Sequence, residues 1–252
     1  GEMTVTRPTL TLAAVHLAGN ALLLFLGYYW LGVGESRALT LLWSAILALL
    51  LISLTCWLHS GTFAFFASDE RTLPAAFRTA ARHLLPLIAV TVALLVLYQL
   101  VSRLADYSSQ PAFQIASWLT LKLRKPIKPS TVQRVFNAGF WLIRWVLIPV
   151  PLLPMIAGVA VHGWAGFGQF GKLAGRRLYW LEAPVLLLAA LWAPLELMGW
   201  VPTVGSFTME IVSFSVRLLV AYLLFVGSWL LLAFLTSAGK PVLTQSKTAV
   251  SP

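Results

Sequence analysis

Residues 38–68, ALTLLWSAILALLLISLTCWLHSGTFAFFAS, contain no lysine, arginine, aspartate or glutamate. About 20 helical residues already span a bilayer core of about 30 Å, and this run of apolar sequence is longer than that. The segment therefore predicts a membrane-spanning helix, and the class of the protein follows from it.

The composition of the whole chain agrees with this interpretation. The chain has 252 residues, of which 59% are hydrophobic and 10% are charged, whereas about a quarter of the residues in a soluble domain are charged. A soluble fold of this size could not bury so much apolar surface. Only helices and closed barrels satisfy their backbone hydrogen bonds in lipid, and the alternation typical of strands is absent from nearly all of the apolar runs. We expect an all-α, polytopic transmembrane helical bundle with six spans, at residues 9–32, 38–67, 84–104, 137–163, 179–200 and 211–237.

These spans form a single transmembrane domain, residues 1–237, followed by a polar tail at 238–252. A signal peptide is the alternative for the first span, because Arg7 precedes the apolar run. That run is longer than the 7 to 15 residues or so of a signal-peptide core, and no A-x-A-like cleavage site follows it. We interpret it as a retained helix.

The chain carries a net charge of +10 and has a pI near 10.3. Its basic residues lie mainly in the junctions between apolar spans, where they favour anionic lipid headgroups and set the topology. No nucleic-acid recognition motif is present. Membrane lipids, rather than nucleic acid, are therefore the expected partners, with a membrane-protein partner as a further candidate.

The first junction, residues 68–83, predicts a short helix that lies in the membrane surface. Helical periodicity puts three arginines on one side and an apolar set on the other. The arginines are Arg71, Arg78 and Arg82, and the apolar set is Leu73, Phe77, Ala80 and Leu84. Thr72 is the expected N-cap, and Pro74 is tolerated because it lies in the first turn. We expect the arginines to face headgroups and Phe77 to face acyl chains.

A second junction, FGQFGKLAGRRLYW at 167–180, has a similar arrangement and contributes Lys172, Arg176 and Arg177 as headgroup-binding candidates. Each junction follows a histidine, His59 or His162, and precedes a proline, Pro86 or Pro184. The pattern indicates an internal duplication of a unit made of helix, basic surface helix and helix.

The most basic stretch is SWLTLKLRKPIKPSTVQR, residues 117–134, which we interpret as a long polar connection because Pro126 and Pro129 break helices. Six spans put it opposite both basic junctions, although positive residues prefer the cytoplasmic side. The count of basic residues still favours both termini in the cytoplasm. The alternative is a re-entrant hairpin at 84–121, with its turn at 106–110, which would bring all the basic regions to one side.

Charged residues near the spans mark a candidate polar path. An ionised group at mid-bilayer costs at least about 2.5 to 3.5 kcal/mol. The four residues concerned are Arg144, Glu182, Glu196 and Arg217. PVPLLP at 149–154 predicts a kinked or two-piece fourth helix near this path, as in many transporters. The alternative is that the four charges are interfacial, or form an internal Glu to Arg pair, and that the prolines are a packing kink.

Histidines provide weak candidates for a haem or metal site. His59 and His162 would emerge on the same membrane face in a six-span topology. No C-x-x-C-H, no H-E-x-x-H and no third clustered ligand accompanies them, so no metal or cofactor is expected. In the first span His16 and Asn20, one turn apart, are expected to form interhelical hydrogen bonds.

The inventory of reactive residues argues against an enzyme. Only two aspartates exist, Asp69 and Asp106, and both lie in junctions. Neither G-x-S-x-G nor a P-loop occurs, and the single cysteine, Cys56, has no neighbouring base in the sequence. We expect no catalytic residues, and an unrecognised lipid-modifying activity is the enzymatic alternative.

The stretch DERTLPAAFRTAARHLLPLI, residues 69–88, resembles the basic surface helices of bacterial YciC-like membrane proteins. It is also similar to the membrane domain attached to some glycerophosphodiester phosphodiesterases. The resemblance covers the second and third spans and, more faintly, the fourth and fifth. It implies six helices in a bacterial inner membrane and supplies no catalytic residues, because no soluble catalytic domain accompanies the spans in this sequence.

Together these observations lead to one expected function and one alternative. We expect a membrane protein without intrinsic catalysis that interacts with lipids or serves as an accessory subunit. The alternative is a small transporter or channel whose path lies near the proline-broken fourth span. A haem protein is a third class.

Overall fold

The computed structural model describes residues 7–34, 36–172, 177–203 and 205–237, and these residues form helices and no strand. Ten α-helices are present among them: α1 (Arg7–Leu31), α2 (Ala38–Ala67), α3 (Leu73–Arg82), α4 (Leu84–Asp106), α5 (Ser109–Leu123), α6 (Pro129–Leu142), α7 (Pro149–His162), α8 (Arg177–Leu187), α9 (Ala193–Gly199) and α10 (Phe207–Ser237). Two π-helical turns, η1 (Ile143–Leu147) and η3 (Leu188–Trp192), join α6 to α7 and α8 to α9. A 3-10 helix, η2 (Gly163–Lys172), follows α7.

Six segments are long and apolar enough to span a membrane, which confirms the predicted fold class and shows a multi-pass membrane protein. Their bounds are Arg7–Leu31, Ala38–Ala67, Leu84–Asp106, Pro129–Gly168, Leu178–Gly199 and Phe207–Ser237. The second agrees with the sequence prediction at both ends, and the fourth begins earlier than predicted.

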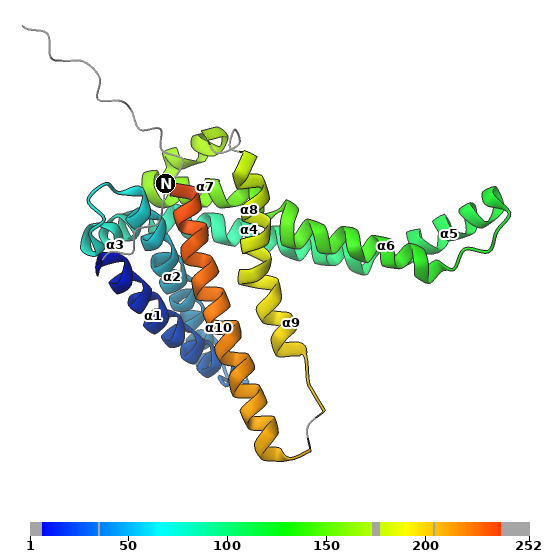
Figure 1. Cartoon of the computed structure of the whole chain (residues 1–252), viewed down its shortest axis with the longest axis horizontal. Helices are drawn as coiled ribbons and strands as arrows, with labels where there is room; N and C mark the ends of the chain where they lie inside the picture. Colours follow the sequence, from blue (N-terminus) through cyan, green and yellow to red (C-terminus); the bar gives the residue numbers. More distant parts are fainter. Residues whose placement is uncertain (1–6, 35, 173–176, 204, 238–252) are drawn as a thin grey trace, which may run out of the picture.

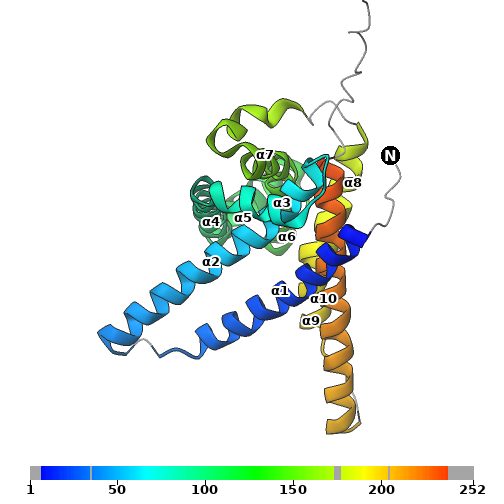
Figure 2. The ribbon, with the colours of Figure 1, turned by 90° about the vertical axis from the view of Figure 1, so that its left-hand side faces the viewer.

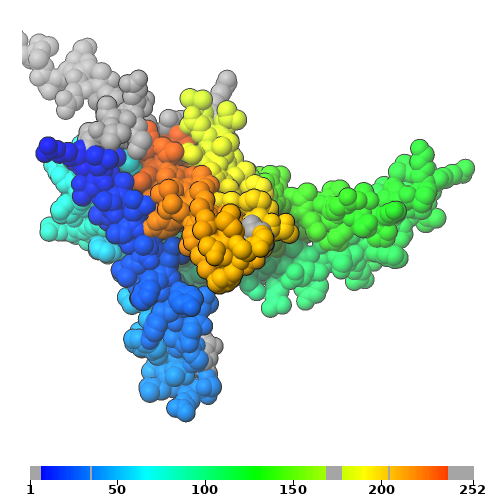
Figure 3. All heavy atoms as spheres, turned by 60° about the horizontal axis from the view of Figure 1, so that its bottom comes forward, coloured from blue at the N-terminus to red at the C-terminus, as the bar shows by residue number. Residues whose placement is uncertain are grey.

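The helices pair into three hairpins that join at one end and splay apart at the other (Figure 1). The first hairpin is α1 with α2, and the third is α8, η3 and α9 with α10. The second, which we call the arm, consists of α4 and α5 running out and α6 returning. Figure 3 shows the three hairpins as separate projections.

The core of the protein lies where the hairpins join, which we call the junction end. The C-terminal part of α2 supplies Phe63, Phe65 and Phe66 to it, and α7 and α10 supply Val159 and Leu232. Away from this end the apolar side chains of the hairpins are largely exposed. Lipid chains cover such surfaces in a membrane, so the exposed apolar residues need no further protein partner.

The segment at 117–134 differs from its prediction as a polar connection. Helix α5 continues to Leu123, and only residues 124–128 form the turn before α6. Pro129 lies in the first turn of α6, where its missing N–H costs no hydrogen bond. Helix α5 extends beyond α4 and packs along α6, so the re-entrant hairpin considered from the sequence is wrong.

The fourth span is a two-piece helix, as PVPLLP predicts. The π-helical turn η1 ends just before Pro149, and Pro154 lies inside α7. The fifth span has the same construction, since η3 comes directly before the first turn of α9, which holds Pro194. A π-helical turn can adjust the helix where a proline removes a backbone donor and crowds the preceding turn.

Candidate functional site

Helix α3 forms at the first junction, as predicted, and it has an exposed basic side. Thr72 is its N-cap residue but makes no side-chain capping bond, and Pro74 lies in the first turn. Arg78 and Arg82 are exposed, whereas Ala76 and Ala80 are buried. The arginines on this helix are therefore free to meet an anionic surface.

Arg71 is not part of this helix. It precedes α3 in a left-handed backbone conformation, with φ at 47°, and is half-buried. Non-glycine residues adopt this conformation uncommonly. The prediction that all three arginines share one helical face therefore holds only for Arg78 and Arg82.

The prediction that Phe77 faces acyl chains is wrong. Its ring lies on Gly61 of α2, where an added Cβ would meet the ring at 2.6 Å. It also makes an edge contact with Trp57 at a centroid distance of 5.2 Å, and the Nε1 of Trp57 donates to the carbonyl of Phe77 at 2.9 Å. Because a glycine leaves room for the ring, α3 packs on α2 through Phe77.

The two junctions meet at the junction end. His83, directly after α3, donates from Nδ1 to the carbonyl of Ala160 in α7 at 3.1 Å, and its ring lies against Gly163. Gly163 has a φ of 59°, which a side chain would strain. The turn from α7 into η2 is therefore shaped around the end of α3.

The second junction takes a different local form from the first. Helix η2 is a 3-10 helix that packs its backbone on α7 through Gly166 and Gly158. Trp164 and Phe167 stack with their centroids 5.9 Å apart and are exposed. The predicted headgroup candidates of this junction lie outside the described residues: Arg176 altogether, and the side chains of Lys172 and Arg177.

A buried polar cluster lies between α1 and α2. Asn20 donates from Nδ2 to the carbonyl of His16 at 2.8 Å and to its Nδ1 at 3.1 Å. Nδ1 is thus the acceptor, so Nε2 carries the proton and donates to the hydroxyl of Thr62, which donates to the carbonyl of Leu58 at 3.2 Å. The interhelical hydrogen bond expected of His16 is confirmed, whereas the hydrogen bonds of Asn20 go to His16 within α1.

His59 belongs to this cluster and not to a helix end. Its ring lies 5.3 Å from that of His16 and makes edge contacts with Trp229 at 4.7 Å and Phe225 at 5.8 Å. Its Nδ1 is buried without a hydrogen-bond partner. His59 therefore lies within the core, because the last turns of α2 pack inside it.

The weak haem and metal hypothesis finds no support in this arrangement. The histidine facing His59 is His16, whereas His162 is exposed at the end of α7. Among the described residues, no group of three or more histidine, cysteine, aspartate or glutamate side chains is placed to hold a metal ion.

The candidate polar path does not converge. Glu182 and Glu196 are exposed, and Arg144 is half-buried in η1 with an Nε that lacks a partner. Arg217 is 9% exposed and donates from Nη1 to the carbonyls of Leu197, Met198 and Trp200, the last at the end of α9. Arg217 thus caps a helix C-terminus, and the acceptors around its guanidinium are backbone carbonyls rather than a glutamate.

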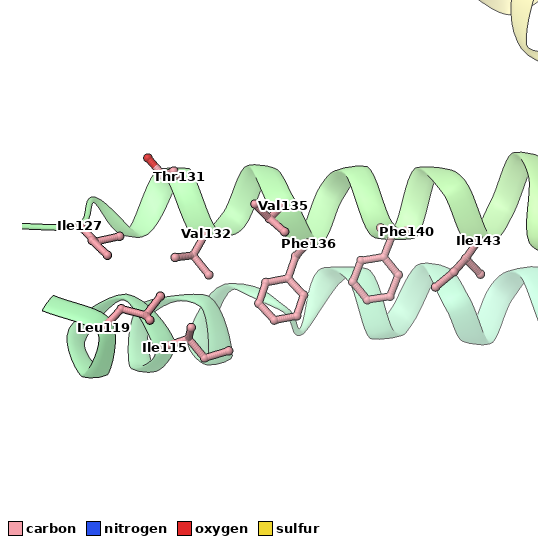
Figure 4. A pocket seen from close by; sticks show the side chains of 10 residues that line it. Ile115, Leu119, Ile127, Thr131, Val132, Val135, Phe136, Phe140 and Ile143 are labelled. Atoms are coloured by element: carbon pink, nitrogen blue, oxygen red, sulfur yellow. The ribbon is translucent and has the colours of Figure 1, made fainter. Parts of the chain in front are cut away.

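A groove runs between α5 and α6 in the arm, a feature that the sequence does not predict (Figure 4). Its volume is about 670 Å³, and Thr131 supplies the only side-chain hydroxyl in a lining that is otherwise apolar. Ile115 and Leu119 face it from α5, and Phe136 and Phe140 face it from α6. The groove can hold apolar groups, and it offers no chemistry for a polar substrate.

Comparison with known proteins leaves the family open: no protein-family model matches the chain, and neither a curated protein nor a solved structure matches it.

Proposed function

We propose that this membrane protein has no catalytic activity of its own and engages anionic lipid headgroups through α3, as a lipid-interacting or accessory protein. The exposed pair Arg78 and Arg82 carries the proposal, because the buried side of α3 holds both arginines at the protein surface. Arginine binds phosphate oxygens in a bidentate manner, which suits a phospholipid headgroup.

Two further observations support the proposal. The docking of Phe77 on Gly61 fixes α3, so no ordering cost falls on the arginines' helix when a headgroup binds. The exposed aromatic pair of η2, Trp164 and Phe167, follows Gly163, which lies against His83 directly after α3, and tryptophan favours membrane interfaces. The junction end is therefore the face that we assign to the headgroup region, on the cytoplasmic side. The bacterial inner membrane follows from the sequence resemblance alone.

The test is a titration of the purified full chain with phosphatidylglycerol, followed by native mass spectrometry. A basic residue near an anionic surface contributes about 1 kcal/mol. Replacing one arginine (Arg78→Gln or Arg82→Gln) should therefore weaken phosphatidylglycerol binding about 5-fold, and replacing both should weaken it about 30-fold.

Arg37→Gln is the matched control, because Arg37 lies at the far end of the first hairpin, and it should leave the affinity unchanged. Added salt should weaken the wild-type interaction, since exposed charges are screened over about 8 Å at physiological ionic strength. Wild-type affinity in the double variant would refute the proposal, and so would an equal loss of phosphatidylglycerol and phosphatidylcholine binding.

A further inference from the structure

The arm runs across the other two hairpins instead of beside them. In Figure 1 it extends sideways while α10 is upright, and in Figure 2 it is seen almost end on while α10 is still upright. Helix α4 has 23 residues and α5 has 15. At about 1.5 Å per residue, and with the two-residue turn between them, the arm is about 60 Å long.

A hairpin of this length fits poorly as a pair of membrane crossings. The hydrocarbon core is about 30 Å thick, so an upright arm would leave about half of its length in water. Fitting all of it into the core would need a tilt of about 60°, whereas transmembrane helices tilt by about 0 to 40°. The arm is thus too long to cross at an ordinary tilt and remain in lipid.

The outer half of the arm is unsuited to water. Phe113 is 61% exposed and Leu121 is 81% exposed, and Trp118, Leu123 and Val135 are exposed as well. The groove between α5 and α6 adds a further apolar surface. Contiguous exposed apolar surface of this kind marks a site of interaction with membrane or protein.

The charge of the turn decides between these two kinds of partner. The end of α5, the turn and the first half of α6 include five basic side chains: Lys122, Arg124, Lys125, Lys128 and Arg134. No aspartate or glutamate occurs between Asp106 and Glu182. Two copies of this turn would repel each other, whereas a negatively charged membrane surface attracts it.

We propose that the arm lies along a single leaflet of the membrane, on the side of α3. Its groove faces the acyl chains of anionic phospholipids, and its basic turn contacts their phosphate groups. The inference deepens the proposed function by adding a second lipid-binding surface on the same face, and it rests on that function only for the choice of lipid. Its consequence is a chain that crosses the membrane four times, through α1, α2, the α8–α9 unit and α10.

This arrangement also removes the conflict with the positive-inside rule. The basic turn then lies on the same side as Arg78 and Arg82, and the start of α1 and the end of α10 share that side (Figure 1). Among the described residues of the far ends of the other two hairpins, only Arg37 and Arg217 are basic, and Arg217 is buried as a helix cap. Nearly all the exposed positive charge thus faces one compartment, as expected for a cytoplasmic side.

The first test determines the side on which the turn lies. In a Cys56→Ser background, single cysteines are introduced by Lys125→Cys in the turn, Glu70→Cys beside α3 and Ser36→Cys at the far end of the first hairpin. Each variant is labelled with a membrane-impermeant maleimide in intact cells and in inverted vesicles. We expect Lys125→Cys to react from the same side as Glu70→Cys and from the side opposite to Ser36→Cys. Reaction of Lys125→Cys from the side of Ser36→Cys would show that the arm crosses, and would overturn the proposal.

The second test identifies the occupant of the groove. The full chain in phosphatidylcholine nanodiscs is irradiated with phosphatidylglycerol that carries a diazirine on its acyl chain, and the labelled peptides are mapped. Gly139 lines the groove, and an added Cβ there meets nothing within 4 Å, so Gly139→Leu introduces a side chain at the groove from a position with open space around its Cβ. Gly227→Leu on α10 is the matched control, because its Cβ also meets nothing.

Labelling should map to peptides within 115–143, should fall at least 5-fold in Gly139→Leu and should persist in Gly227→Leu. Lys125→Gln combined with Lys128→Gln should reduce the preference for phosphatidylglycerol over a phosphatidylcholine probe about 30-fold, at about 1 kcal/mol per basic residue. Equal labelling by the two probes in the wild type, unchanged labelling in Gly139→Leu, or dimers cross-linked through the arm would each overturn the proposal. None of these variants changes α3, so failure here is distinct from failure of the proposed function.

Discussion

The contact of η2 with α7 gives a sharp test of how the junction end is held together. At Gly166 an added Cβ would fall inside van der Waals contact with the backbone of Gly158 and the amide nitrogen of Val159. Backbone atoms cannot rotate away as a flexible side chain can, so Gly166→Ala must push η2 off α7. Overpacking a core with side chains costs about 1 to 3 kcal/mol, and we expect about 3 kcal/mol for this backbone collision.

The loss is measurable by thermal unfolding of the detergent-purified protein, followed by tryptophan fluorescence. One kcal/mol shifts Tm by about 2 to 4 °C in a chain of about 150 to 250 residues, so Gly166→Ala should lower Tm by about 6 to 12 °C. Gly168→Ala is the control, because an added Cβ there meets nothing within 4 Å, and its Tm should stay near the wild-type value. Gly158→Ala should have a smaller effect, since its Cβ would stand 3.0 Å from a single carbonyl oxygen. Equal Tm values for Gly166→Ala and Gly168→Ala would refute the close approach of the two backbones.

Three other contacts lead to predictions for the same assay or for hydrogen exchange. Asn20→Leu removes the donor to His16 Nδ1 and leaves a buried acceptor unpaired, which should cost about 1 to 3 kcal/mol in thermal unfolding. Gly61→Ala should lower Tm because its methyl group meets the ring of Phe77, and adding Phe77→Leu should restore part of the loss; a further drop in the double variant would contradict this. Arg217→Met removes donors to three carbonyls at the end of α9, so amide exchange should accelerate at the α9–α10 turn and stay unchanged in α2.

The spans were the most predictable part of this fold, since the length of an apolar run is a local property of the sequence. The 38–67 span was predicted at both ends because the charge-free run has charged neighbours just beyond it at Arg37 and Asp69. The arm was less predictable. Pro126 and Pro129 predict an interruption of the helix, but a proline is compatible both with the end of a helix and with the first turn of the next one. The pairing of α5 with α6 determines which of the residues around the prolines are helical.

The candidate site was predicted in part, and the predictions that failed concern how deeply Phe77 and His59 are buried and which helices they contact. Helical spacing was enough to place Arg78 and Arg82 on one side of α3. It could not show that Phe77 packs on Gly61, since that contact joins two helices through a missing side chain. His59 was assigned to a helix end because α2 was treated as an isolated span. The last turns of a 30-residue helix can instead enter the core, and they do so here.

The histidine and arginine placements share a physical reason. A buried polar side chain in a membrane protein needs a partner within the protein, because lipid offers none. His16 finds Asn20 and Thr62, and Arg217 finds the carbonyls that end α9. Sequence reasoning looks for opposite charges as partners, and it therefore offered an internal Glu to Arg pair as one alternative for the four charges near the spans. The last carbonyls of a helix are hydrogen-bond acceptors whatever their residue type, so the sequence does not show which of them a buried arginine will meet.

The two basic surfaces differ in the way in which the protein supports them, and this difference bears on what each can do. Helix α3 is fixed by Trp57, Gly61 and the contact of His83 with α7, so its arginines stand at a constant place relative to the core. The basic turn of the arm lies at the far end of a single hairpin and contacts no other hairpin (Figure 1). A rigid site can select a lipid headgroup by geometry, whereas a long projecting hairpin responds chiefly to the surface charge of the leaflet, which decays within a Debye length.

Both Arg78→Gln and Arg78→Lys should therefore weaken binding at α3, Arg78→Lys less so, because a lysine keeps the charge but not the bidentate geometry. At the turn Lys125→Arg should leave lipid binding unchanged, because the charge is the same. A change in binding there as large as that caused by Arg78→Lys at α3 would contradict this division of roles.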